Sequence, residues 1–205
     1  MRQDSPDSRP ERYRALASAE NYNSKITPPS VVRRFSHWLE ARAVERALGD
    51  VKGDSVLDCP CGTGRLDGQL RARFNTVVGL DSSEAMLAVY RQGHPERIGQ
   101  QGDAFALPFA DEQFAWVVCH RLLHHFQLDD DRVRLLKSLA RVARMGLIVY
   151  AWLDTPLNRR RHSRRQTLAP DHLPSLLAAA GLTLEKVHYA AWPFQPKAEL
   201  LCRKI

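Results

Sequence analysis

The segment LDCPCGTGRL, residues 57–66, carries two cysteines and two glycines that could each do chemistry. A structural zinc site usually takes two close cysteine pairs, or one pair with two nearby histidines. Here Cys59 and Cys61 form one pair, whereas Cys119 and Cys202 are isolated. We therefore expect no metal, and we interpret the pair as small residues at the buried end of a strand.

The two glycines predict a tight turn between a strand and a helix, at which a ligand can approach the backbone. The next strand, TVVGL, ends at Asp81, whose carboxylate could accept both hydroxyls of a ribose. A dinucleotide fingerprint needs a third small residue three positions after Gly64, and that residue is Asp67. A pyrophosphate there would meet a carboxylate, so the pattern disfavours a nicotinamide cofactor. The P-loop lysine motif is also missing from the sequence.

Three segments together are typical of one family. VLDCPCGTGRL, VVGLDSSEAML and GDAFALPFADEQFAWVVCHRLLHHF resemble, in order and spacing, the cofactor motifs of class I S-adenosylmethionine-dependent methyltransferases. The branch that looks most similar includes the ubiquinone and menaquinone C-methyltransferases. The resemblance covers roughly residues 55–153. It implies a Rossmann-like fold, S-adenosylmethionine as the cofactor, and methyl transfer to a small molecule.

The resemblance also implies roles for the residues of the first two motifs. Asp58 would anchor the glycine loop and orient groups near the amino end of the cofactor. Gly62 and Gly64 would pass close to its methionine and ribose. Asp81 would accept the ribose hydroxyls, and Ser82 would lie beside the adenine.

The third motif implies the remaining cofactor contacts. Asp103 would accept from the adenine amino group, and the backbone of Ala104 would face the ring edge. Cys119 and His120 would lie along the methionine moiety. Asp81 and Asp103 could also serve as ordinary turn or helix-capping residues, and that alternative stays open.

One position of the cofactor loop departs from the family. The family usually has glycine where this chain has Pro60. Proline fixes φ near −65° and favours an extended conformation at Cys59, which suits a strand end. We still expect Cys59 and Pro60 to line the cofactor site.

Three further features are candidates for catalysis and for acceptor binding. His124 or His125 could act as a general base near neutral pH, although a packing role is equally compatible with the pattern. Tyr22 could fold over the cofactor, as N-terminal segments often do in this family. The run NRRRHSRR could bind an anionic or phosphorylated acceptor through guanidinium groups. Its arginines are Arg159, Arg160, Arg161, Arg164 and Arg165.

Alternating strands and helices must position these residues. The pattern predicts an α/β fold, an open and mainly parallel sheet covered on both faces and ending in an antiparallel C-terminal pair. We expect helices over residues 31–48, 62–73, 83–91, 128–144 and 171–181. We expect strands over residues 55–59, 76–80, 97–101, 114–120, 147–152, 183–189 and 198–203.

Composition sets the remaining limits. The 205 residues are 44% hydrophobic, with no apolar run long enough to span a membrane, and carry a formal net charge of +7. The polar N-terminus lacks the apolar core of a secretory signal, so we expect a cytoplasmic protein. We expect a flexible segment over residues 1–27 and a single domain over residues 28–205, in which the first helix could act as a lid. The oligomeric state is open.

Two other functions compete with a small-molecule methyltransferase. The basic charge would suit an RNA methyltransferase. However, the fourth strand ends in Cys-His-Arg-Leu, whereas enzymes that methylate exocyclic base nitrogens usually have Asn or Asp followed by Pro-Pro and an aromatic residue. Nucleic acid is therefore the less favoured partner. A non-catalytic protein that binds S-adenosylmethionine and acts through a partner is the second alternative.

Overall fold

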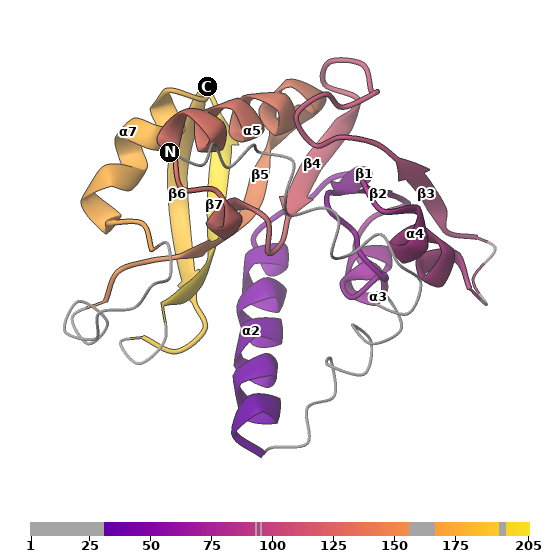
Figure 1. The fold of residues 1–205 in the computed structure, drawn as a ribbon, viewed down its shortest axis with the longest axis horizontal. Helices are drawn as coiled ribbons and strands as arrows, with labels where there is room; N and C mark the ends of the chain where they lie inside the picture. Colours follow the sequence, from indigo (N-terminus) through magenta and orange to yellow (C-terminus); the bar gives the residue numbers. More distant parts are fainter. Residues whose placement is uncertain (1–30, 93, 95, 156–166, 193–195) are drawn as a thin grey trace, which may run out of the picture.

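The computed structural model describes residues 31–92, 94, 96–155, 167–192 and 196–205, and these form a sheet covered by helices (Figure 1). The strands are β1 (Ser55–Asp58), β2 (Thr76–Asp81), β3 (Ile98–Gln101), β4 (Phe114–Cys119), β5 (Ala143–Trp152), β6 (Leu182–Tyr189) and β7 (Lys197–Lys204). The α-helices are α2 (Val31–Gly49), α3 (Asp67–Arg71), α4 (Glu84–Arg91), α5 (Asp129–Val142) and α7 (Leu173–Ala178), and the 3₁₀ turns are η3 (Leu123–His125) and η4 (Pro170–His172).

The strand order is β3-β2-β1-β4-β5-β7-β6. Strands β1 to β5 pair in parallel, whereas β7 runs antiparallel to both β5 and β6. This arrangement confirms the predicted fold class. The carboxyl ends of β1, β2 and β4 consequently lie at one edge of the sheet, where open α/β sheets bind ligands.

Alternating side chains of the strands build a core on each face of the sheet. Val56 and Trp116 face one side, where they pack with apolar residues of α2 and α3. Leu57 and Val117 face the other side, which the leucines of α5 and α7 cover. These two helices lie together over β5 to β7 in Figure 1. β1 and β4 are buried along their whole length, as expected for central strands of a sheet that is covered on both faces.

The predicted boundary between the fourth helix and the fifth strand was wrong. We expected the helix to reach Arg144 and the strand to begin at Leu147, but β5 begins at Ala143. Ala143 pairs with Phe114, and the register then shifts before the next pair of β4 and β5. Pairing with β4 therefore overrides the local helical pattern.

The helix that follows the glycine loop is shorter than predicted, because α3 covers only five residues and the segment before it forms turns. The last helix also differs, because a 3₁₀ turn at η4 precedes α7. Within the described part of the chain, no helix is long and apolar enough to cross a membrane.

Candidate functional site

The glycine loop leaves the sheet between its two neighbouring strands. The backbone N–H of Cys59 donates to Val118 O of β4 at 2.9 Å, and that of Cys61 donates to Leu80 O of β2 at the same distance. The peptide bond between Cys59 and Pro60 is cis. Both thiols are buried, and burial raises the pKa of each. They are core residues, and the described residues contain no group of histidines, cysteines and carboxylates that could hold a metal.

Two residues of the loop require glycine. Gly62 has φ of +54° and Gly64 has φ of +86°, a left-handed region that side chains rarely adopt. A Cβ at Gly64 would lie 2.7 Å from Cδ2 of Tyr90, whereas a Cβ at Gly62 would meet no described atom within 4 Å. Gly64 therefore serves packing as well as conformation, and the backbone at Gly62 borders open space.

Asp81 joins the glycine loop to the end of β2. Its Oδ2 accepts from the backbone N–H of Gly62 at 2.9 Å, and its Oδ1 accepts from the N–H of Ser83 at 2.9 Å. Burial raises the pKa of this carboxyl, and these backbone donors oppose the rise. Each carboxylate oxygen has two acceptor positions, so Asp81 can fix the loop and still accept from a ligand. Ser82 is exposed beside it.

Asp58 is a buried carboxyl at the end of β1. Its Oδ1 has no hydrogen-bond partner among the described residues. Burial, and then the charges of Asp67 and Asp81, raise its pKa well above the usual value. An unpaired buried carboxyl is costly, so this position favours a ligand that brings a donor or a positive charge.

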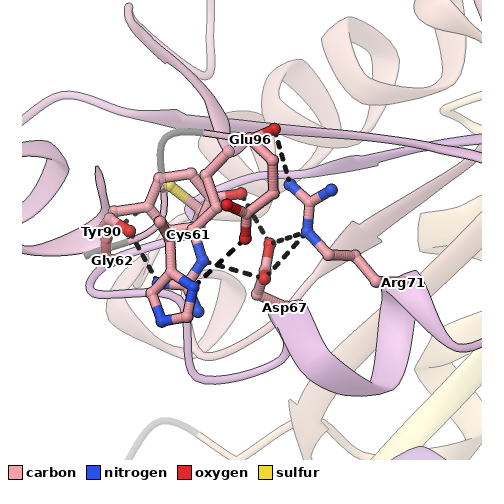
Figure 2. Close-up of polar contacts among 8 residues, drawn as sticks. Cys61, Gly62, Asp67, Arg71, Tyr90 and Glu96 are labelled. Atoms are coloured by element: carbon pink, nitrogen blue, oxygen red, sulfur yellow. Dashed lines mark hydrogen bonds and ion pairs between the residues drawn. The ribbon is translucent and has the colours of Figure 1, made fainter. Parts of the chain in front are cut away.

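A buried carboxylate just beyond the loop, which the sequence did not identify as structural, holds the loop in place (Figure 2). Asp67 accepts from Nε of Arg71 at 3.0 and 3.1 Å, from Nε of Arg97 at 3.0 Å and from the hydroxyl of Tyr90 at 2.9 Å. The ring of Tyr90 in turn packs against Gly64. Only the i,i+4 spacing of Asp67 and Arg71 was visible in the sequence.

Residues of the third motif divide between surface and core. Asp103 is exposed, and its Oδ1 accepts from the N–H of Phe105 at 2.9 Å, which is a turn-stabilising contact. Ala104 beside it is half-buried. Cys119 is fully buried in the core, and burial raises the pKa of its thiol. Roles for these residues in adenine and methionine binding stay predictions.

His120 follows β4 and is buried against a carboxyl of β7. Its Nδ1 lies 3.0 Å from Oε1 of Glu199, although the angle at this contact is poor for a hydrogen bond. Burial raises the pKa of Glu199, while the neighbouring His120 and Arg121 oppose the rise. The ring of Tyr150 packs edge-on against the imidazole, 4.7 Å away between centroids.

A second buried carboxylate, Glu40, fastens α2 to the same edge of the sheet. Glu40 forms ion pairs with Arg121 and Lys197, and Arg65 lies 3.9 Å away. Burial alone would raise the pKa of Glu40, but these cations outweigh it and lower the pKa to about 2. Arg121 has φ of +61°, an uncommon conformation for a residue with a side chain.

A cavity of about 60 Å³ lies within this region, with room for a few water molecules or the end of a ligand. Glu40, Arg65 and His120 supply its charged and titratable lining.

The two histidines proposed as bases lie in η3. His124 stacks on Trp152 with 4.7 Å between ring centroids and 13° between planes. Burial, with the charges of His125 and Arg121, lowers the pKa of His124 to about 3. Such an imidazole is a weak proton acceptor at neutral pH, which argues against His124 as the base. His125 is exposed.

Some predicted site residues cannot be placed. Tyr22 and the five arginines of residues 159–165 lie outside the described residues, as does the segment over residues 1–27. Their roles stay predictions.

Comparison with known proteins supplies a family match and two groups of relatives. Residues 57–151 match the family described as "Methyltransferase domain". A demethylmenaquinone methyltransferase of Mycobacterium sp. (strain JLS) is 34% identical over 155 residues, which are 73% of this chain and 65% of that protein. A probable tRNA methyltransferase 9B of Mus musculus is 31% identical over 130 residues, which are 62% of this chain and 28% of that protein. The chain therefore spans about two thirds or less of these curated relatives.

The fold also has solved counterparts. The magnesium protoporphyrin IX methyltransferase of Synechocystis PCC 6803, solved with bound SAH, superposes with a TM-score of 0.78. The alignment covers 97% of this chain and 100% of that one at 18% identity. At this identity the likeness concerns the fold.

Proposed function

The chain resembles the class I S-adenosylmethionine-dependent methyltransferases in sequence and fold, and from this premise we propose that it is such an enzyme, acting on a small acceptor. One contact carries the proposal: the hydrogen bond between the N–H of Gly62 and Oδ2 of Asp81. It joins the two motifs that a nucleoside cofactor needs, the glycine turn and the acidic strand end. The two residues are 19 positions apart in the chain.

The described residues fit S-adenosylmethionine. Asp58 has an unpaired buried oxygen that suits the positively charged amino group of the methionine end. Asp81 has acceptor positions left for ribose hydroxyls, and the backbone at Gly62 borders open space. Ser82, Asp103 and Ala104 would border the adenine.

These residues would contribute mainly by positioning. Bound S-adenosylmethionine supplies an electrophilic methyl group on a sulfonium sulfur. The glycine loop and Asp81 would hold the ribose, and Asp58 would orient the amino end. Residues at the ends of β4 and β5 would hold the acceptor in line and keep water out. Such orientation can contribute several kcal/mol to the rate.

The cofactor assignment predicts a clear binding preference. We expect S-adenosylhomocysteine and S-adenosylmethionine to bind, and NAD not to, because the loop lacks the third small residue of the dinucleotide fingerprint and has the buried Asp67 at that position. Isothermal titration calorimetry with each compound checks this. Tighter binding of NAD than of S-adenosylhomocysteine would refute the methyltransferase proposal.

We expect Asp81→Ala to weaken S-adenosylhomocysteine binding about ten- to a hundredfold, since charged hydrogen bonds are worth roughly 1.5–3 kcal/mol. Loss of the Gly62 contact adds to the effect, because the loop loses its anchor. Asp111→Ala is the matched control, since that carboxylate pairs with Arg141 on the exposed surface. Calorimetry should show unchanged affinity for the control. Equal affinities of all three proteins would remove Asp81 from the site.

The acceptor we propose is a small anionic or phosphorylated metabolite, or a lipid-linked one. The menaquinone-type relatives and the arginine run of residues 159–165 support this. RNA is the second candidate, which the murine tRNA methyltransferase relative supports. Tritium-labelled S-adenosylmethionine should label a compound in a small-molecule extract of host cells. Label that enters only unmodified tRNA would favour the RNA candidate, and binding without any labelling would favour a non-catalytic protein.

A further inference from the structure

We propose that His120 accepts the proton that the acceptor loses during methyl transfer, and that Glu199 positions its ring. This inference rests on the proposed function and names a base that the sequence did not identify, since His120 was expected only along the cofactor.

Three adjacent strands bring the pair together. Tyr150 of β5 pairs with Glu199 of β7, and the preceding residue of β5, Val149, pairs with Cys119 of β4. His120 directly follows Cys119, so the side chains of His120, Tyr150 and Glu199 lie side by side across the three strands. The register, rather than a local motif, thus places Nδ1 of His120 3.0 Å from Oε1 of Glu199.

Glu199 is the group that would select which ring nitrogen is basic. Its Oε1 lies 3.0 Å from Nδ1 without hydrogen-bond geometry, and a small turn of the ring would let an N–H on Nδ1 donate to this oxygen, because a carboxylate only accepts hydrogen bonds. Nε2 then keeps its lone pair. Nε2 is buried and has no hydrogen-bond partner among the described residues. His120 as a whole is 7% exposed.

The location suits a base. His120 ends the strand next to β1, from which the glycine loop departs, and it lines the cavity together with Arg65 of that loop and Glu40 of α2. The acceptor atom must lie close to the cofactor's methyl group, hence near this edge. His124, the base considered from sequence, stacks on Trp152 and has a pKa of about 3.

The acceptor's O–H or N–H bond would break, its proton would pass to Nε2 of His120, and its electron pair would stay on the acceptor atom that receives the methyl group. The electron pair of the carbon–sulfur bond would leave with S-adenosylhomocysteine. The imidazolium is stabilised by Glu199 and later releases its proton to water.

The first test does not depend on turnover. Nitrogen-15 NMR of histidine-labelled protein with bound S-adenosylhomocysteine should show hydrogen on Nδ1 of His120 and none on Nε2; His120→Asn assigns the signal. Glu199→Gln should shift the ring toward the Nε2–H tautomer, whereas Glu199→Asp should preserve the wild-type tautomer. Hydrogen on Nε2 in the wild type would overturn the proposal.

The second test measures transfer of tritiated methyl groups to the small-molecule extract. His120→Asn should slow labelling by about a hundredfold or more, which is the lower range for general-base catalysis, and Glu199→Gln should slow it less. Affinity for S-adenosylhomocysteine should fall much less than the labelling rate. His188→Asn is the matched control, because its Nε2 pairs with Asp50 2.8 Å away and it is equally buried. Its labelling rate should equal that of the wild type.

The outcomes separate the two proposals. If the wild type binds S-adenosylhomocysteine and labels an acceptor, and His120→Asn labels at the wild-type rate, His120 is not the base while the proposed function stands. If the wild type binds no S-adenosylhomocysteine, the proposed function fails.

Discussion

Asp67→Asn is expected to lower the free energy of unfolding by about 3 kcal/mol. Breaking a buried ion pair by removing one charge costs roughly 3–5 kcal/mol. The lower end of this range applies because the side chains of Arg71 and Arg97 are 29% and 14% exposed, so water can hydrate their guanidinium groups in the variant. The amide would also direct N–H donors toward guanidinium donors and leave Tyr90 without a charged acceptor.

Urea denaturation measures this loss, and Asp111→Asn is the control. Asp111 forms an ion pair of similar geometry with Arg141 but is 75% exposed, so its loss should change stability by less than about 0.5 kcal/mol. Cofactor affinity should fall as well, because Tyr90 packs against Gly64. A loss below about 1 kcal/mol for Asp67→Asn would show that the cluster in Figure 2 does not support the loop.

Glu40→Gln is expected to destabilise the protein by about 3 kcal/mol at pH 7, because the drop in the pKa of Glu40 from 4.5 to about 2 corresponds to 1.36 kcal/mol per unit. The folded-state pKa is the lower one, so this stability is fully present above pH 4.5. It disappears as the pH falls from 4.5 toward 2, where the folded protein also takes up the proton. The difference between wild type and variant should therefore shrink over that interval.

Urea denaturation of both proteins at a series of pH values checks the profile. Glu45→Gln is the matched control, since Glu45 belongs to the same helix and pairs with Arg73 at 2.9 Å while 41% exposed. It should lose less than about 0.5 kcal/mol at pH 7. A wild-type to Glu40→Gln difference that stays constant from pH 7 to pH 2 would contradict the electrostatic account of how α2 is held.

The residues proposed to hold the cofactor could be identified in the sequence because their determinants are local. A strand, two glycines and a helix lie within residues 55–71, and the next strand ends at Asp81. The contact between Gly62 and Asp81 then arises from two neighbouring parallel strands, β1 and β2. The alternation of strands and helices likewise predicts the mainly parallel sheet, and the two C-terminal strands, which are close in sequence, predict its antiparallel end.

Only the tertiary structure decided which distant charges meet. His120 and Glu199 are 79 positions apart and come together through the register of three strands. Glu40 of α2 forms an ion pair with Arg121, which follows β4. No sequence pattern links these two segments. Asp67 looked like an obstacle to a phosphate in the sequence, and folding makes it an internal anchor. The periodicity of a sequence indicates which face of a helix or strand is apolar, whereas ion pairs depend on how whole elements pack. The candidate base His120 and the two buried anchors, Asp67 and Glu40, could therefore be identified only in the tertiary structure.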